Sequence, residues 1–165
     1  MAHYSRMSAE ALGERDAHQL FQNVWEHYTG CVGGYLGDGE DADVPMQVRT
    51  VCRLSYFLAE IGGGGINDYL WNHCFKLRTL QQIYADLGEV GATHLMSLLE
   101  SGIRLALQSN NGEFLEDEGA HEWAEQFTSA PDISSEELDR QSSYAAYPGG
   151  SEAVAEYVRK NIEAF

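Results

Sequence analysis

The chain has few of the residues that mark secreted or membrane proteins. It contains only three cysteines, Cys31, Cys52 and Cys74, an odd number at wide spacing that argues against a disulfide framework. No run approaches the roughly 18 uncharged apolar residues that a membrane-spanning helix needs. Residues 1–7 also lack the apolar core of a signal peptide. These absences predict a reduced, cytoplasmic protein without a transmembrane helix.

Basic residues are scarce as well. The 165 residues include 10 Lys and Arg against 26 Asp and Glu, for a net charge of −16. Residues 44–109 are neutral with five of each sign, whereas residues 1–43 hold eight acids and two bases and residues 110–165 hold thirteen and three. A field of this sign repels nucleic acid and anionic membranes and attracts basic proteins. The charge therefore argues against direct nucleic-acid or membrane binding and favours a basic protein partner, with a merely solubilising surface as the alternative.

Only three prolines occur, and no β-type alternation of useful length is present. Apolar residues recur instead at spacings of three and four, which is typical of amphipathic helices. We expect a flexible tail over residues 1–7 and a single all-α bundle of about seven to eight helices over residues 8–165, a length that buries roughly 70% of the unfolded surface. The expected helical segments are 8–28, 44–61, 67–72, 77–87, 92–106, 113–128, 134–146 and 151–162.

The most unusual segment is the glycine run inside Glu60–Asn72, which interrupts two apolar helical stretches. Four consecutive glycines lose much conformational entropy on folding, which indicates that the backbone there adopts a conformation or a close contact that other residues would not allow. We predict that Gly64 or Gly65 adopts a positive φ and turns one helix sharply into the next. Glu60, at the end of the first helix, is expected to pair with Arg53 or with free N–H groups of the following turn.

The same segment resembles the signature of a bacterial family of uncharacterised domains typified by a neisserial DNA-mimic protein. The family pattern is roughly E-V-N-N-G-G-F-x-Q-Y/F-F-x-N, with Ile66 in place of Phe and Asp68 in place of Gln. Glu89–Ala92 and Leu138–Arg159 are similar to two further family elements, so the resemblance covers 44–165. It implies an all-helical fold, homodimerisation and no established enzymatic activity. The residues of this structural motif are Glu60, Gly64, Gly65, Tyr69, Trp71 and Asn72.

Acidic residues dominate the region from Asn110 to Asp139, which holds ten Asp and Glu and no Lys or Arg. On a helix, Glu118, Glu122 and Glu125 would share one face at about 5–6 Å between Cβ atoms. Duplex DNA spaces its phosphates by about 3.4 Å of axial rise per strand. Such a row of carboxylates would imitate a strip of phosphate charge. The predicted partner contacts are Glu113, Glu116, Asp117, Glu118, Glu122, Glu125, Glu136, Glu137 and Asp139, with Asp38, Glu40 and Asp41 as auxiliary ones.

The prediction from these features is a non-enzymatic acidic binding protein. In its sharpest form it is a DNA mimic that occupies the basic surface of a DNA-binding protein such as a transcription factor. One alternative is an immunity-type inhibitor of a basic toxin. Another is a small enzyme or ligand-binding domain at the Gly62–Trp71 corner, using Glu60, Asp68, Tyr69 and His73.

Cofactor and metal motifs are incomplete. The glycine run follows a helix and lacks the Lys-Ser/Thr of a phosphate loop. The Asp38–Asp43 loop departs from the EF-hand pattern at Ala42, Asp43 and Arg49. His27 and Cys31, with His73 and Cys74, have no paired zinc-ligand spacing. We therefore predict no cofactor and no metal.

Overall fold

The computed structural model describes residues 4–31, 44–72, 76–109, 118–127, 130 and 132–165. These residues form α-helices and short helical turns without a β-strand, so the predicted all-α class is confirmed. The helices are α1 Ala9–Leu12, α2 Ala17–Cys31, α3 Met46–Asn72, α4 Leu77–Val90, α5 Thr93–Ser109, α6 Glu118–Ala124, α7 Ser135–Ala145 and α8 Ser151–Lys160. The shorter turns are η1 Glu125–Phe127, η2 Ala146–Gly150 and η3 Ile162–Ala164.

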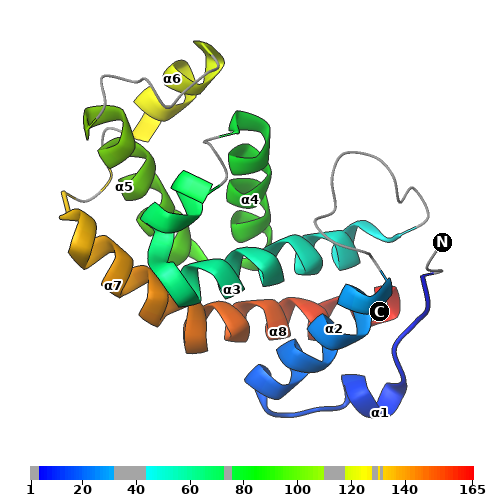
Figure 1. Ribbon diagram of the computed structural model, residues 1–165. Helices are drawn as coiled ribbons and strands as arrows, with labels where there is room; N and C mark the ends of the chain where they lie inside the picture. The colour runs from blue at the N-terminus through cyan, green and yellow to red at the C-terminus, as the bar shows by residue number, and fades with distance from the viewer. Residues whose placement is uncertain (1–3, 32–43, 73–75, 110–117, 128–129, 131) are drawn as a thin grey trace.

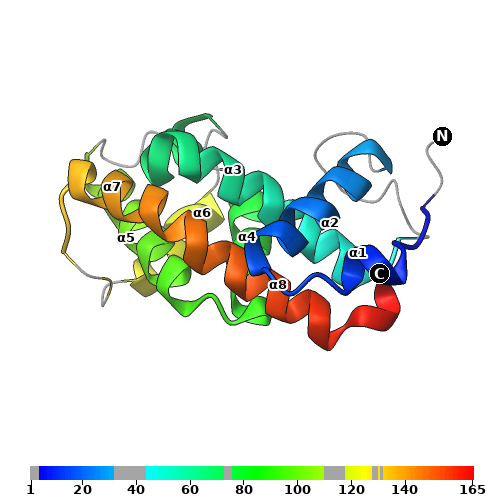
Figure 2. The same cartoon turned by 90° about the horizontal axis from the view of Figure 1, so that it is seen from below.

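Helix α3 is the central element. Its apolar residues at spacings of three and four, Val48, Val51, Leu54, Leu58 and Ile61, are each at most 1% exposed. Figure 1 shows α8 running beside α3, with α4 and α5 on the other side of α3. Seen from below, α7 and α8 follow one another along the length of the molecule (Figure 2). Helices α5, α6 and α7 therefore reach one end of the molecule, and α1 and the C-terminus lie at the other.

The N-terminal segment differs from the expected single helix over residues 8–28. Helix α1 ends at Leu12, and α2 begins only at Ala17. Asp16 causes the new start, because its Oδ1 accepts a hydrogen bond from the backbone N–H of Gln19 at 2.8 Å and so caps α2. Ahead of α1, Met7 is buried and its N–H donates to the carbonyl of Phe165 at 2.6 Å. The expected tail is thus packed against the C-terminus at Met7.

Two corners connect the later helices. Helix α4 ends at Val90, beyond the expected end at 87. Gly91 follows it in the left-handed conformation (φ 78°), and the N–H of Ala92 donates to the carbonyl of Leu87 at 2.9 Å. Between α7 and α8 the chain turns through η2 and a cis peptide bond at Tyr147–Pro148. Ser151, where the last helical segment was expected to begin, is the first residue of α8 and donates its hydroxyl to the carbonyl of Pro148 at 2.8 Å.

A buried ion pair joins α3 to α4. Arg53 Nε and Nη2 lie 2.6 and 2.9 Å from the two carboxylate oxygens of Asp86, and Thr50 donates to the same carboxylate at 3.3 Å. The side chains of Arg53 and Asp86 are 13% and 4% exposed. Arg53, one of the two kinds of partner expected for Glu60, thus pairs with a carboxylate of the neighbouring helix.

Candidate functional site

The glycine run forms a sharp corner within α3. Gly65 has φ 87° and ψ 178°, while the residues on either side are helical. This region of backbone conformation is essentially restricted to glycine, because a Cβ would clash with the adjacent peptide groups. The predicted positive φ at Gly64 or Gly65 is therefore confirmed, at Gly65.

Helix α7 caps the second half of α3 at this corner. Asp139 Oδ1 accepts the backbone N–H of Asn67 at 2.9 Å, and Asp139 Oδ2 accepts the Asn67 side-chain amide at 3.0 Å. Ser142 Oγ accepts the N–H of Ile66 at 3.0 Å. The N–H groups at a new helix start lack intrahelical partners. They are satisfied here by side chains of another helix, which fixes α7 against the corner.

The other motif residues divide between core and surface. Tyr69 is 1% exposed and packs edge-on against Phe57, with ring centroids 4.9 Å apart. Ile66 and Leu70 fill the inside of the corner and are at most 1% exposed. Trp71 is 63% exposed, Asn72 is exposed, and Glu60 and Gly64 are half-buried. Within the described residues, apolar side chains thus fill the inside of the corner, and side chains of α7 form a polar cap over it.

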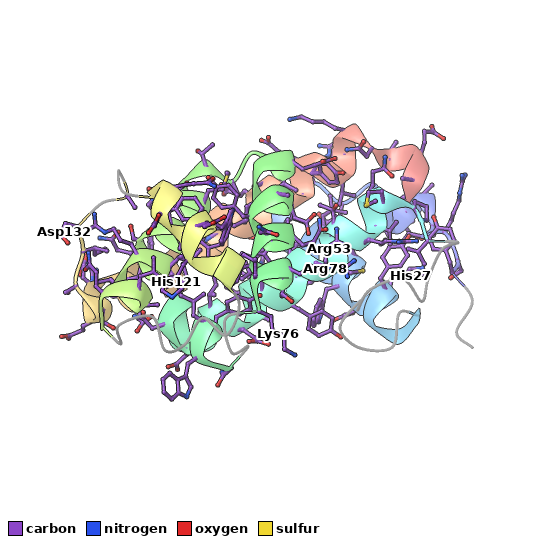
Figure 3. The ribbon with its side chains drawn as sticks, turned by 90° about the horizontal axis from the view of Figure 1, so that it is seen from above. His27, Arg53, Lys76, Arg78, His121 and Asp132 are labelled. Carbon is purple, nitrogen blue, oxygen red and sulfur yellow. The ribbon has the colours of Figure 1, made fainter. Side chains whose placement is uncertain are left out.

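The predicted acidic contacts lie partly on what we call the acidic arm, the described residues of α6, η1 and 132–137. Within the arm, Glu122, Glu125 and Glu136 are exposed. Glu122 lies in α6, whereas Glu125 begins the 3₁₀ turn η1. Glu118 starts α6. Figure 3 shows the arm from above, with His121 on α6 and Asp132 at the outer end of the molecule. Six predicted contacts lie outside the described residues: Asp38, Glu40, Asp41, Glu113, Glu116 and Asp117.

Aromatic side chains hold the arm on the core. The ring of Trp123 lies edge-on to Tyr84 and Phe127 at centroid distances of 5.9 and 4.9 Å. Tyr84 also donates its hydroxyl to Glu100 at 2.5 Å, and this hydrogen bond together with burial raises the pKa of Tyr84 to about 12. The spacing of residues along α6 does not reveal that Tyr84 of α4 receives Trp123 and Phe127, because the two helices are distant in the sequence.

An arginine of α5 fixes the chain where it leaves the arm's helical part. Arg104 Nη1 donates to the carbonyl of Ala130 at 2.9 Å, and Nη2 donates to Asp132 at 2.7 Å. The arm therefore has a defined position against α4 and α5. Its exposed carboxylates are presented from a supported backbone.

Two of the predicted contacts are engaged within the protein. Glu137 forms a bidentate ion pair with Arg140 at 2.5 and 2.7 Å. This pair, with a further hydrogen bond from Gln141, lowers the pKa of Glu137 to about 2. Asp139 caps the glycine corner, as described above. Asp139 thus stabilises the fold through its hydrogen bonds with Asn67, whereas the sequence predicted it as a surface contact for a partner.

Within the ranges that the structure describes, no group of three His, Cys, Asp or Glu side chains is arranged to hold a metal ion. His27, one of the weighed candidates, has its Nε2 2.9 Å from the carbonyl oxygen of Ser5. His73 and Cys74 lie outside these ranges. Among the described helices, none is long and apolar enough to cross a membrane.

Comparison with known proteins assigns a family. The sequence model of the family described as DMP19-like protein matches residues 42–161, which is most of the chain and includes both the glycine corner and Asp139. No curated protein and no solved structure matches the chain.

Proposed function

The chain belongs to the DMP19-like protein family, and on that premise we propose that it is a non-enzymatic acidic protein that mimics DNA and occupies the basic surface of a DNA-binding protein. The observation that carries this proposal is the acidic arm. Glu122, Glu125 and Glu136 are exposed on a segment that is anchored to the core. Ten acids without a Lys or Arg lie between residues 110 and 139.

The arm has the property that a phosphate mimic requires. Fixed charges attract a partner with little loss of side-chain and loop entropy on binding, because the backbone is already ordered. Trp123, Phe127 and Arg104 give the arm that order. Long-range attraction between this surface and a basic face would also accelerate encounter.

Affinity capture tests the proposal. The chain is immobilised, an extract of its native host is passed over it, and bound proteins are eluted with a salt gradient or with duplex DNA. We expect a DNA-binding protein that elutes at moderate salt and in the presence of duplex DNA. Steep salt dependence follows from charge–charge contacts at an exposed surface.

Charge-neutralising variants locate the interface. The triple variant Glu122→Gln, Glu125→Gln and Glu136→Gln should lose most of the captured protein. A matched control removes three exposed carboxylates at the opposite end: Glu10→Gln, Glu156→Gln and Glu163→Gln. Equal capture by both variants, or a complex indifferent to duplex DNA, contradicts the proposal. Capture of a secreted basic nuclease would favour the immunity-type alternative.

A further inference from the structure

A surface groove lies where the two corners of the chain meet. Its volume is about 420 Å³, and it opens between the α4–α5 corner and the α7–α8 corner. A Cβ placed on Gly91 or Gly149 would meet no heavy atom within 4 Å, so both corner glycines face open space. The lining residues are Gly91, Ala92, Thr93, His94, Leu95, Tyr144, Ala145, Pro148, Gly149 and Ala153.

The groove has a largely apolar lining and an aromatic rim. Ala92, Leu95 and Ala145 are buried, whereas the ring of Tyr144 is 78% exposed and Pro148 is exposed beside it. An exposed tyrosine offers a large contact area at a low cost in conformational entropy when it is covered. The groove therefore fits one apolar side chain better than a charged one.

The groove is continuous with the acidic arm along α7. Glu136, Glu137, Arg140 and Tyr144 follow one another at helical spacing, and Tyr144 lies about 12 Å along the axis from Glu136 at 1.5 Å per residue. Arg140 is engaged by Glu137, and the groove lining contains no Lys or Arg. A segment that reaches from the arm to the groove thus passes Glu136 and the Glu137–Arg140 ion pair before it meets apolar surface.

We propose that this groove receives one apolar side chain from a cationic segment of the partner, while the acidic arm contacts the Lys and Arg residues that flank it. This inference rests on the proposed function and adds a contact that salt does not screen. It also gives the partner a means to distinguish this protein from the DNA that it imitates. A second copy of the chain fits this arrangement less well, because its 10 Lys and Arg against 26 Asp and Glu bring little positive charge to the acidic arm.

Two lysine-rich peptides of equal length and charge test the inference, one with a central Phe and one with Ala in its place. Their affinities are measured by fluorescence anisotropy at low salt and at about 0.15 M salt. We expect the Phe peptide to bind about tenfold more tightly, because burial of the ring adds apolar contact. Both affinities should fall with salt, while their ratio is maintained.

Two variants assign the preference to the groove. Gly149→Leu adds a side chain at a position where a Cβ meets no heavy atom within 4 Å, and Tyr144→Ala removes the exposed rim. Each should abolish the preference for Phe and leave the affinity for the Ala peptide unchanged. Ile162→Ala removes another exposed apolar side chain, outside the groove lining, and should preserve the preference.

The outcomes separate this inference from the function on which it rests. Salt-dependent binding of both peptides with equal affinity overturns the groove inference and leaves the proposed acidic contact standing. Absence of salt-dependent binding by either peptide overturns both. If sedimentation shows a dimer that Tyr144→Ala dissociates, the occupant is a second copy and the inference is wrong.

Discussion

The backbone of Gly65 lies directly against the side chain of Asp139. A Cβ at Gly65 would stand 2.5 Å from the Cβ of Asp139, whose carboxylate caps the half of α3 that begins at this corner. The glycine motif and the closing element of the family pattern therefore meet at one contact. The absence of a side chain at Gly65 is what allows α7 to approach closely enough to supply the cap.

Gly65→Ala should lower the free energy of unfolding by about 3 kcal/mol or more. The positive φ accounts for about 1–3 kcal/mol, and displacement of Asp139 adds the loss of the cap. Urea denaturation followed by circular dichroism measures the change. Gly63→Ala is the matched control, because its Cβ meets nothing within 4 Å and its φ is not in the left-handed region. That control should be neutral or stabilising by up to about 1 kcal/mol, and equal losses in the two variants would show that the contact does not matter.

Asp139→Ala should cost about 1–2 kcal/mol of unfolding free energy, the usual range for loss of a helix cap. Asp139→Asn retains one acceptor oxygen and should cost less. Glu136→Ala, on the same helix but exposed, should change stability by no more than about 0.5 kcal/mol. If Asp139→Ala and Glu136→Ala lower the free energy of unfolding by similar amounts, the capping role of Asp139 is wrong.

The sequence predicted elements with strong local signals and missed relationships between distant segments. The stripe of α3, the start of α8 at Ser151 and the positive φ in the glycine run each depend on a few neighbouring residues. The Asp139 cap and the Arg53–Asp86 pair depend on which helices become neighbours, and local spacing does not contain that information. Asp139 illustrates this limit. In the sequence it is one of a run of acidic residues and resembles a residue of a solvent-exposed helix face. Its hydrogen bond with the backbone of Asn67 forms only because α7 packs on α3.

The pH dependence of stability provides a test of two tyrosine contacts. The pKa of Tyr84 is raised from 10.0 to about 12 by its hydrogen bond to Glu100 and by burial. Burial first and Glu89 second raise the pKa of Tyr157 from 10.0 to about 12. Because the folded pKa exceeds the unfolded one, the contribution to stability is complete below pH 10 and is lost as the pH rises from 10 to about 12. Denaturant titrations across this interval should show the loss, and Tyr84→Phe with Tyr157→Phe should make the profile flatter. If the double variant loses stability between pH 10 and about 12 as the unsubstituted protein does, the loss does not come from these two tyrosines.

Removal of one member of the Arg53–Asp86 pair should be far more damaging than removal of both. Asp86→Ala leaves the guanidinium of Arg53 without its carboxylate at a site where both side chains are largely buried, 13% and 4% exposed. An uncompensated buried charge costs about 3–5 kcal/mol, and we expect a loss of that size in urea denaturation. The double variant Arg53→Met with Asp86→Leu removes both charges and keeps apolar volume, so it should recover most of the loss. Ionic strength gives a second test, because salt screens a buried ion pair poorly. The loss of unfolding free energy caused by Asp86→Ala should therefore be the same at low and high ionic strength. Glu156→Gln, which breaks an exposed pair with Lys160 at 4.0 Å, should change stability by less than about 1 kcal/mol. If Asp86→Ala is as mild as that control, the pair is not a determinant of the packing of α4 on α3.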